Sequence, residues 1–509
     1  MKTSEPRQPF CRAHCIAALL LPLLAAPAAY AQRPAINSEA QKEAPTAFAG
    51  AEPKPLLSWG SGDGKSYWVP AADILVEELL LNQFDRNFID RKVYGSTFSS
   101  IGKNLRGRWE VDNDPFNINQ FAHPYQGSIY HGFARSAGLS FWESVGYTEA
   151  GSLLWELAGE TSKPSINDQF TTGLGGSLLG EPLFRMASLL LESRHGGRPG
   201  FWREAGAAVI SPSLGFNRQA HGDRFAGVFR SNDPAVYTRI ELGANLNGHV
   251  KSNVRIADTT GTGTTPQSFQ RGEAAADFTI AYGLPGKPGY TYNRPFDYFH
   301  FQFTAATASI FENVISRGLL YGKDYAVGDN YRGVWGLYGT YDYIAPQIFR
   351  VSTTGAGLGT TGQLWLSKLV AYQGTALAGA GYGSAGSIRG AGERDYHNGI
   401  TPQALLASRL IFSDRAAVDL ELRDYYVSGL ASRETGGSEN IARAEASLTL
   451  RVYKLHGIAL KYAYSQRDAK YPNASSTHQN VGAVSIAYSY LGQTHFGAVD
   501  WRPKQDGGL

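Results

Sequence analysis

Residues 113–192 of this chain contain histidine and carboxylate side chains among many small and aromatic residues. His123, His131, Glu143 and Asp168 are of the types that transfer protons or orient a nucleophile, so they are the candidate catalytic residues. Structural hydrogen bonding is the competing interpretation for both histidines. For Asp168 the competing interpretation is helix capping, because a serine precedes it by three residues.

Three glutamates in the same region are candidate metal ligands. At about 100° per residue, Glu149, Glu156 and Glu160 fall on one narrow stripe of a helix. Like charges at this spacing repel each other, so a divalent cation or basic side chains would stabilise the stripe. The alternative is a solvated face of an amphipathic helix. No other cofactor is predicted.

Sequence motifs of known enzymes are missing from the chain. It contains no G-x-S-x-G nucleophile elbow, no H-E-x-x-H zinc motif and no Walker loop. No histidine is followed two residues later by serine, the local arrangement that outer-membrane lipid hydrolases show. These absences favour a protein without enzymatic activity but leave an envelope enzyme as the alternative.

The first 31 residues have the pattern of a secretion signal. Lys2, Arg7 and Arg12 form a basic start, residues 16–26 are apolar, and an A-x-A site ends at Ala31. We expect cleavage after Ala31. Both cysteines of the chain lie within this segment, so the mature protein would contain no thiol.

The charge balance of the mature chain excludes a class of partner. Removing three basic residues and Glu5 with the signal lowers the net charge from +3 to +1. A nearly neutral chain without a basic block is not expected to bind nucleic acid. The 28 Tyr and 25 Phe instead suit a membrane interface, where amphipathic rings gather.

The second half of the chain alternates apolar and polar residues. In residues 443–453, Ala446, Leu448 and Leu450 point one way, and Ser447 and Thr449 point the other. This pattern recurs in segment after segment, and behind a secretion signal it predicts a transmembrane barrel with lipid outside and a polar lumen. The lumen positions carry both charge signs, which favours ion pairs closing the lumen.

We expect an all-β antiparallel barrel of about 12 strands. Besides the strongly alternating segments, weaker strands are predicted near Ala207, Leu319, Phe349, Trp365, Leu377, Leu406 and Val499. The last strand is expected either at 483–490 or at 496–501. The predicted domains are a signal peptide (1–31), a flexible leader (32–55), a helical region (56–200), the barrel (201–501) and a polar tail (502–509).

Helical periodicity marks the region before the barrel. Around residues 70–84, leucines and an isoleucine recur at helical spacing against Glu77 and Glu78. Further helices are predicted over about 128–145, over about 149–160 with Thr148 as its cap, and from Ser165 to about 192. We expect this helical element to lie in the periplasm or to plug the lumen.

Several ordered motifs in this region resemble a known family. They are Asn113-Asp114-Pro115-Phe116, Asn119-Gln120-Phe121, His123-Pro124-Tyr125-Gln126-Gly127, Tyr130-His131, Trp142-Glu143 and Pro164-Ser165-Ile166-Asn167-Asp168. From about Trp109 to Glu192 the chain resembles the bacterial family catalogued as domain of unknown function 3943. The resemblance implies an envelope protein with a barrel following, and it implies no activity.

The combined expectation is an outer-membrane barrel of a Gram-negative bacterium. Its expected partners are outer-membrane lipid and the barrel-assembly machinery, and the sequence leaves the oligomeric state open. A narrow or plugged barrel would serve envelope support or the passage of small solutes. The alternative is an envelope enzyme that acts on lipid or glycan through the histidines and carboxylates of the helical region.

Overall fold

The computed structural model describes residues 56–502, except for 58, 60–61, 113, 193–197, 253–255, 258–263, 266–267, 308–309, 346–348, 388–395, 430–436 and 473–475. The predicted signal peptide, the leader and all but Arg502 of the polar tail lie outside the described residues. The chain divides into two compact units. The helical unit contains the described residues up to Glu110, Gln126–Pro164 and Leu183–Ser231, and the barrel unit contains Val111–Tyr125, Ser165–Pro182 and the residues from Asn232 onward.

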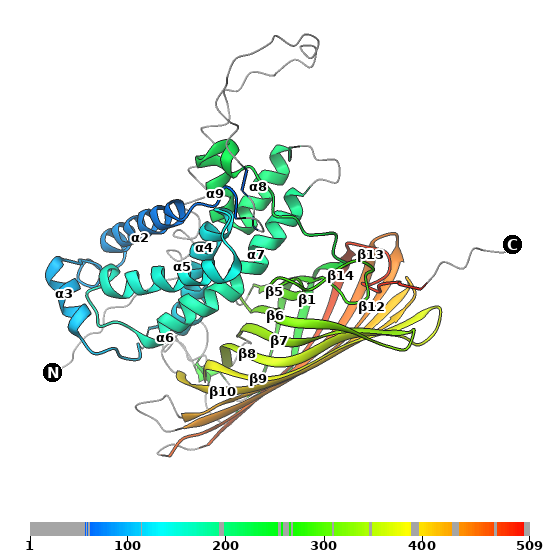
Figure 1. Ribbon diagram of the computed structural model, residues 1–509. Coiled ribbons are helices and arrows are strands. Elements are labelled where there is room, and N and C mark those ends of the chain that lie inside the picture. Colours follow the sequence, from blue (N-terminus) through cyan, green and yellow to red (C-terminus); the bar gives the residue numbers. More distant parts are fainter. Residues whose placement is uncertain are drawn as a thin grey trace, which may run out of the picture. The chain divides into compact units, whose positions relative to one another are not determined.

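The helices precede the barrel strands in the sequence (Figure 1). None of the described helices is both long enough and apolar enough to cross a membrane. Helices α4 and α7 each begin in the barrel unit and end in the helical unit. In order the helical elements are α2 (Trp68–Phe88), α3 (Phe98–Arg106), the π-helical turn η1 (Ile118–Ala122), α4 (His123–Ser136), α5 (Phe141–Leu154), the π-helical turn η2 (Trp155–Gly159), α6 (Ile166–Asp168), the π-helical turn η3 (Gln169–Gly175), α7 (Gly176–Leu191), α8 (Phe201–Ile210), α9 (Pro212–Ala220) and the 3₁₀ turn η4 (Gly222–Phe225).

The break between the two central helices differs from the prediction. Helix α4 ends at Ser136, and Gly138 follows with φ of +88°, a conformation that glycine adopts without strain. Helix α5 then begins at Phe141, because the Ser140 side chain accepts from the Glu143 amide and the Glu143 carboxylate accepts from the Ser140 amide. The predicted break near 145–148 and the predicted Thr148 cap are therefore wrong.

The predicted cap of the third helix is confirmed. The Ser165 hydroxyl accepts a hydrogen bond from the Asp168 amide at 3.2 Å. From there α6, η3 and α7 continue to Leu191 with Pro182 inside α7, close to the predicted end near 192.

The helical part extends beyond its predicted end. Ala207, predicted to lie in a weak strand, is part of α8, and the first barrel strand begins only at Val236. Ala207 is buried together with Phe184, Leu191, Leu214 and Phe229, and this packing fixes a helix where the sequence also allows alternation.

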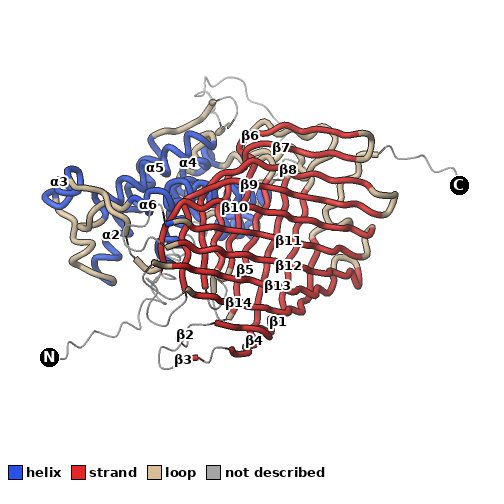
Figure 2. Tube along the Cα trace, turned by 90° about the horizontal axis from the view of Figure 1, so that it is seen from below, coloured by secondary structure: helices blue, strands red, loops and turns tan. Residues whose placement is uncertain are grey.

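Twelve strands of the described chain close into one antiparallel barrel, as predicted. Figure 2 shows neighbouring strands of this barrel following one another across the sheet. A separate two-stranded sheet, β2 (Ile256–Ala257) with β3 (Thr264–Thr265), lies between the first two barrel strands in the sequence. The barrel strands are β1 (Val236–Ser252), β4 (Ser268–Tyr282), β5 (Phe299–Ala306), β6 (Asn313–Val327), β7 (Tyr331–Ile344), β8 (Phe349–Trp365), β9 (Val370–Ser387), β10 (Tyr396–Phe412), β11 (Ala416–Val427), β12 (Ser438–Tyr453), β13 (His456–Lys470) and β14 (Thr477–Leu491).

The predicted inside and outside faces of β12 are confirmed. Leu448 and Leu450 are exposed, whereas Ser447 and Thr449 are buried. Because strand neighbours in register point to the same side, the outward face can be followed along the sheet. The outward Leu422 pairs with Leu406, and further pairs lead through Ala376 and Thr360 to the exposed Trp335 on β7.

Most connections at one end of the barrel are short, the exception being residues 283–298 between β4 and β5. Only Lys454 and Leu455 separate β12 from β13, and residues 413–415 separate β10 from β11. We call this the short-turn end and the opposite one the long-loop end. The last strand is β14, so of the two predicted positions 483–490 is confirmed and a strand at 496–501 is wrong.

The outward face is not exposed everywhere. Every second residue of β7 counted from the outward Trp335 also points outward, and Tyr341 and Tyr343 are among these residues. Both tyrosines are nevertheless buried. The Tyr341 hydroxyl donates to the Gln120 carbonyl at 2.7 Å, and the Phe116 and Tyr343 ring centroids lie 5.8 Å apart.

Two segments before the barrel therefore lie against its outer wall. On neighbouring strands, Tyr382 stacks on Phe170 at 5.4 Å, and the Ser316 hydroxyl donates to the Leu178 carbonyl at 2.6 Å. These side chains are register neighbours of outward residues, so residues 111–125 and 165–182 are outside the lumen. Of the two positions expected for the helical element, the periplasm or the lumen, these two segments do not occupy the lumen.

Candidate functional site

Two of the predicted catalytic residues converge in the segments that cover the outer wall. His123 begins α4, and Asp168 ends the short helix that Ser165 caps. The His123 Nε2 and Asp168 Oδ2 atoms are 3.8 Å apart, and on the other side of the ring the Nδ1 atom is 3.2 Å from the Thr172 hydroxyl. All three side chains are buried. An imidazole between a carboxyl and a hydroxyl group is the order of groups that activates a nucleophile.

The details of this cluster weaken a catalytic role. A separation of 3.8 Å is longer than a hydrogen bond, so Asp168 does not orient the His123 ring directly. Burial, with Asp112 and Asp114 nearby, raises the pKa of Asp168 well above its usual range, which favours the neutral acid. Thr172 is 2% exposed, so no substrate reaches its hydroxyl in this conformation.

The surrounding polar groups fix the segments to the barrel. Asn167 accepts from the Asp112 amide at 2.7 Å and donates to Asp168 at 2.9 Å. Asn119 donates to the Tyr396 hydroxyl at 2.9 Å, and that hydroxyl donates to the Asp114 carbonyl at 2.7 Å. Each asparagine is fully buried, where an unpaired polar group would be costly. The arrangement explains the asparagine-rich motifs as structural contacts.

Glu143 has a structural position. Its carboxylate completes the cap of α5, lies 3.1 Å from the Lys65 ammonium, and accepts from the Tyr67 hydroxyl at 2.8 Å. Partial burial raises the pKa of Glu143, but hydrogen bonds from Ser140, Tyr67 and Lys65 outweigh it and lower the value to about 2. His131, the remaining candidate, is buried in the helical unit with its ring centroid 5.4 Å from that of Phe141.

The glutamate stripe does not persist in the structure. The chain changes from α-helix to the π-helical turn η2 at Trp155, and the wider turn rotates Glu156 and Glu160 away from the predicted line. Glu156 is buried rather than solvated, and Glu160 accepts from the Trp155 indole at 3.0 Å. Within the described residues no group of three or more His, Cys, Asp or Glu side chains could hold a metal ion.

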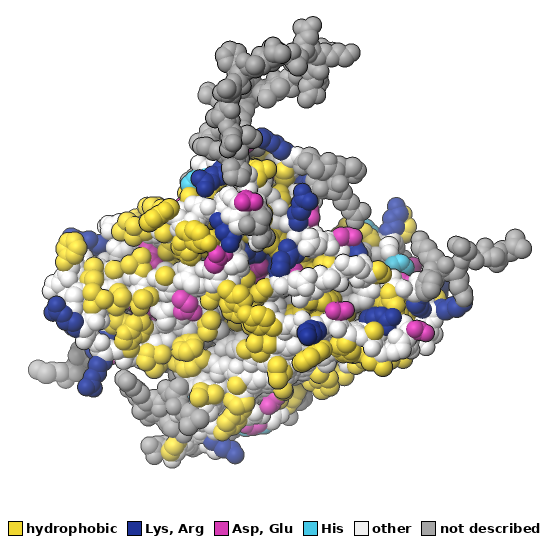
Figure 3. Space-filling view, in the orientation of Figure 1, with side chains coloured by type: hydrophobic (Ala, Val, Ile, Leu, Met, Phe, Trp, Pro, Cys, Tyr) yellow, Lys and Arg dark blue, Asp and Glu magenta, His cyan; other side chains and the backbone are white. Residues whose placement is uncertain are grey.

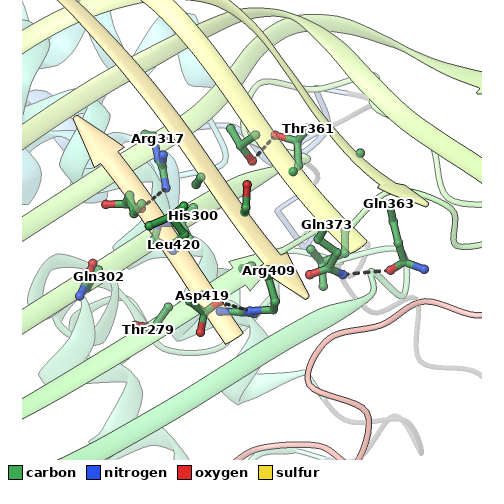
Figure 4. Close-up of a pocket in the computed structure, with 18 of the residues that line it drawn as sticks. Thr279, His300, Gln302, Arg317, Thr361, Gln363, Gln373, Arg409, Asp419 and Leu420 are labelled. Atoms are coloured by element: carbon green, nitrogen blue, oxygen red, sulfur yellow. Dashed lines mark hydrogen bonds and ion pairs between the residues drawn. The ribbon is translucent and has the colours of Figure 1, made fainter. Parts of the chain in front are cut away.

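A polar chamber of about 110 Å³ in the lumen was not predicted as a site. Figure 4 shows its wall, including the ion pair of Arg409 with Asp419 and the hydrogen bond between Gln373 and Gln363. Asp419 also lies 3.2 Å from Arg239 on the distant strand β1. Since roughly 10–15 Å³ of such volume holds one water, the chamber has room for several waters or one small solute.

Ion pairs join the walls of the lumen on the long-loop side of the chamber. Arg423 lies 2.5 Å from Glu421 on its own strand and 3.0 Å from Asp342 across the lumen. Arg467 lies 2.5 Å from the buried Glu439. The mixed charges predicted for the lumen thus form ion pairs with one another. Farther toward that end the lumen is filled by the apolar side chains Ile315, Ile344, Phe349, Val351, Ala385, Tyr425, Val427, Ile441 and Val481.

The chain after the last strand closes the short-turn end. Residues 493–501 turn back toward the lumen, where the Gln363 side chain donates to the Val499 carbonyl at 2.6 Å and accepts from its amide at 2.9 Å. Gln373 donates to the Gly497 carbonyl at 2.8 Å, and Phe496 is fully buried. The sequence signal was the aromatic and apolar run before the polar tail, which resembles a strand in composition.

Comparisons with known proteins agree with the sequence motifs. The family model described as Domain of unknown function (DUF3943) matches residues 108–213, which confirms the resemblance. Among curated proteins no match is found.

Solved structures similar to this chain include outer-membrane barrels. The NanC porin is 7% identical with a TM-score of 0.27, covering 49% of this chain and 98% of its own. An outer membrane channel from Pseudomonas putida F1 is 8% identical (TM-score 0.27, 52% and 99% covered). The toluene transporter TodX of Pseudomonas putida is 11% identical (TM-score 0.20, 51% and 90% covered). At these TM-scores the likeness carries no argument about activity.

Proposed function

We propose that the protein is a closed outer-membrane barrel that anchors the helical unit in the envelope and supports the envelope, rather than a pore. One observation carries the proposal: the lumen is blocked on both sides of the chamber. Residues 493–501 close the short-turn end, and ion pairs followed by an apolar cluster close the long-loop end.

The size of these barriers decides against passage in this conformation. A buried Arg–carboxylate contact such as Arg423 with Asp342 leaves an uncompensated charge when it is broken, which costs about 3–5 kcal/mol. Several such contacts and the apolar cluster would have to open together before a solute could pass. Short turns are periplasmic in outer-membrane barrels, so the terminal segment would lie at the periplasmic mouth. We further propose cleavage after Ala31 and insertion by the barrel-assembly machinery.

Reconstitution tests the closed state. The purified full chain in planar bilayers should give no conductance steps under conditions in which an open porin does. A chain lacking residues 493–509 should also stay closed, because the barrier at the long-loop end is intact. Discrete steps from the full chain would overturn the proposal, and heat-dependent migration on gels would show that each sample is folded.

A cellular experiment tests the role in envelope support. Cells lacking the gene should take up a membrane-impermeant dye faster, and the full chain should restore the barrier. Arg423→Met, which weakens the barrel interior, should restore it less. Normal dye exclusion without the gene would contradict a role in envelope support.

A second candidate function is favoured by the position of His123 between Asp168 and Thr172. In an envelope enzyme acting on lipid or glycan, His123 would accept the Thr172 proton after a movement that opens the cluster. Lipid profiles of cells carrying Thr172→Val should then equal those of cells without the gene. A profile equal to the wild type would exclude this role for Thr172.

A further inference from the structure

Helix α2 has its apolar and acidic faces reversed relative to an ordinary surface helix. Leu75, Leu79 and Leu80 are exposed, the last two by 56% and 61%, whereas Glu78 is buried. Helices of soluble proteins normally turn their apolar stripe inward. The sequence shows the two faces of α2, and only the structure shows that the leucines face out.

The inward face of α2 explains how the acids tolerate burial. Ile74 packs beside Tyr130 at Gly151, where an added Cβ would approach the tyrosine ring to 2.7 Å, so α2 and α5 are in close contact. Burial raises the pKa of Glu77 to about 8 and that of Glu78 to about 9. Both are therefore largely uncharged at neutral pH, so their burial on the inward face does not require an uncompensated charge.

Basic residues accompany this apolar face. Residues 86–108 contain six Lys or Arg residues and one acidic residue. Within the same stretch Phe98 is 95% exposed and Leu105 is exposed, on a helix whose Lys103 and Arg106 are also exposed. Figure 3 shows hydrophobic side chains gathered at the part of the helical unit that carries α2 and α3, with Lys and Arg beside them.

We propose that α2 and α3 form a membrane-binding face that lies on an anionic phospholipid surface. Exposed leucines with Phe98 would enter the boundary between headgroups and acyl chains, and the basic residues would contact phosphate groups. Charge complementarity selects this occupant. None of the four acidic residues of α2 is fully exposed, whereas residues 86–108 expose five basic side chains and one acid, Asp90. A protein groove could cover the leucines, but this excess of exposed basic residues fits a negatively charged bilayer. The barrel already requires a bilayer for its outward face.

Labelling at a single cysteine tests the proposal, because residues 32–509 contain no cysteine. The chain from residue 32 carries Leu79→Cys, labelled with an environment-sensitive dye, and is reconstituted into phosphatidylglycerol vesicles with brominated acyl chains. Asp223→Cys is the matched control, since its side chain is 73% exposed in the same unit, outside α2 and α3. We expect the bromines to reduce the Leu79 emission at least twofold and to leave the control unchanged.

Charge reversal separates lipid binding from simple apolar insertion. With Lys103→Glu and Arg106→Glu added, the Leu79 label should lose most of its quenching in anionic vesicles. No quenching at Leu79 would overturn the proposal and point to a protein partner. Quenching that is equal in phosphatidylcholine vesicles, or equal at the control position, would also overturn it. Barrel folding, read from gel migration, must be intact in every variant.

Discussion

An arginine on the outward face should cost stability according to its depth in the bilayer. Leu460 on β13 is 52% exposed and pairs with Leu448 and Ile486 on the neighbouring strands. Leu448 pairs with Val418 on β11, and Asp424, six residues farther along that strand, is an exposed charge on the same face. Asp424 therefore marks one edge of the apolar band.

The heights follow from the strand geometry. At about 3.3 Å per residue and a tilt of about 40°, Asp424 lies roughly 15 Å from Val418 along the barrel axis. Because the strands are tilted, each step to a register partner on the next strand changes the height by a further ~3 Å. Val452, four residues beyond Leu448 toward the short-turn end, lies roughly 10 Å below it and is 67% exposed. The apolar band of an outer-membrane barrel is about 25 Å tall, so Leu460 lies near its middle and Val452 near its edge.

Leu460→Arg should therefore lower the free energy of unfolding by about 2–4 kcal/mol, and Val452→Arg by about 0–1 kcal/mol. Guanidinium unfolding of the protein in vesicles, followed by tryptophan fluorescence, measures both variants against the parent chain. Equal losses, or a larger loss for Val452→Arg, would show that this face is not in the bilayer at the inferred height.

Three further predictions concern charges. Arg423→Met should cost about 3–5 kcal/mol, because it leaves the buried Asp342 without its cation and Glu421 with only Arg317 at 3.7 Å. Adding Asp342→Leu should recover part of the loss in the same unfolding assay. The ion pair of Glu143 with Lys65 is partly exposed, so Glu143→Gln should cost roughly 0.2–1 kcal/mol of unfolding free energy. Because the pKa of Glu143 in the folded state is lowered to about 2, this cost should be present above pH 4.5 and diminish as the pH falls toward 2. A cost that does not change with pH would refute the ion pair as its source. Burial raises the folded pKa of Glu78 to about 9, so the contribution of Glu78 to the free energy of unfolding falls as the pH rises from about 4.5 to about 9. Glu78→Gln should therefore raise the melting temperature of the helices, measured by circular dichroism, at pH 8 but not at pH 4.

The barrel was predictable because the alternation of apolar and polar residues within each strand distinguishes its lipid face from its lumen face. Leu448 and Thr449 alternate whatever their neighbours do, so the lipid face of β12 follows from local sequence. The strand count also needed the rule that such barrels have an even number of strands. The helix start at Phe141 was also encoded, since Ser140 and Glu143 have the spacing of a capping box. Ala207 could not be assigned locally, because only its packing partners distinguish helix from strand there.

The candidate site depended on contacts between distant segments. Nothing in the spacing of His123 and Asp168 indicates that they meet, because the fold brings together segments 45 residues apart in number. The outer-wall contacts did leave a signal: Ser316 and Thr354 are polar residues at outward positions, where lipid would favour apolar ones. At these two positions, away from the edge of the apolar band, the polar outward residue marks protein contact.

The covered flank of the wall has a consequence for how the protein reaches its membrane. A barrel that enters a bilayer from one side must present lipid-compatible surface along that side. Strands β11 to β14 offer such a surface, with Leu422, Leu460 and Ile486 exposed. The flank with Tyr341, Thr354 and Tyr382 is matched to residues 111–125 and 165–182, which are synthesised earlier than any strand. These segments would have to dock before that flank meets acyl chains, so their docking would be a step in the assembly of the barrel. Where they cover the wall, the ring of lipid around the barrel is interrupted.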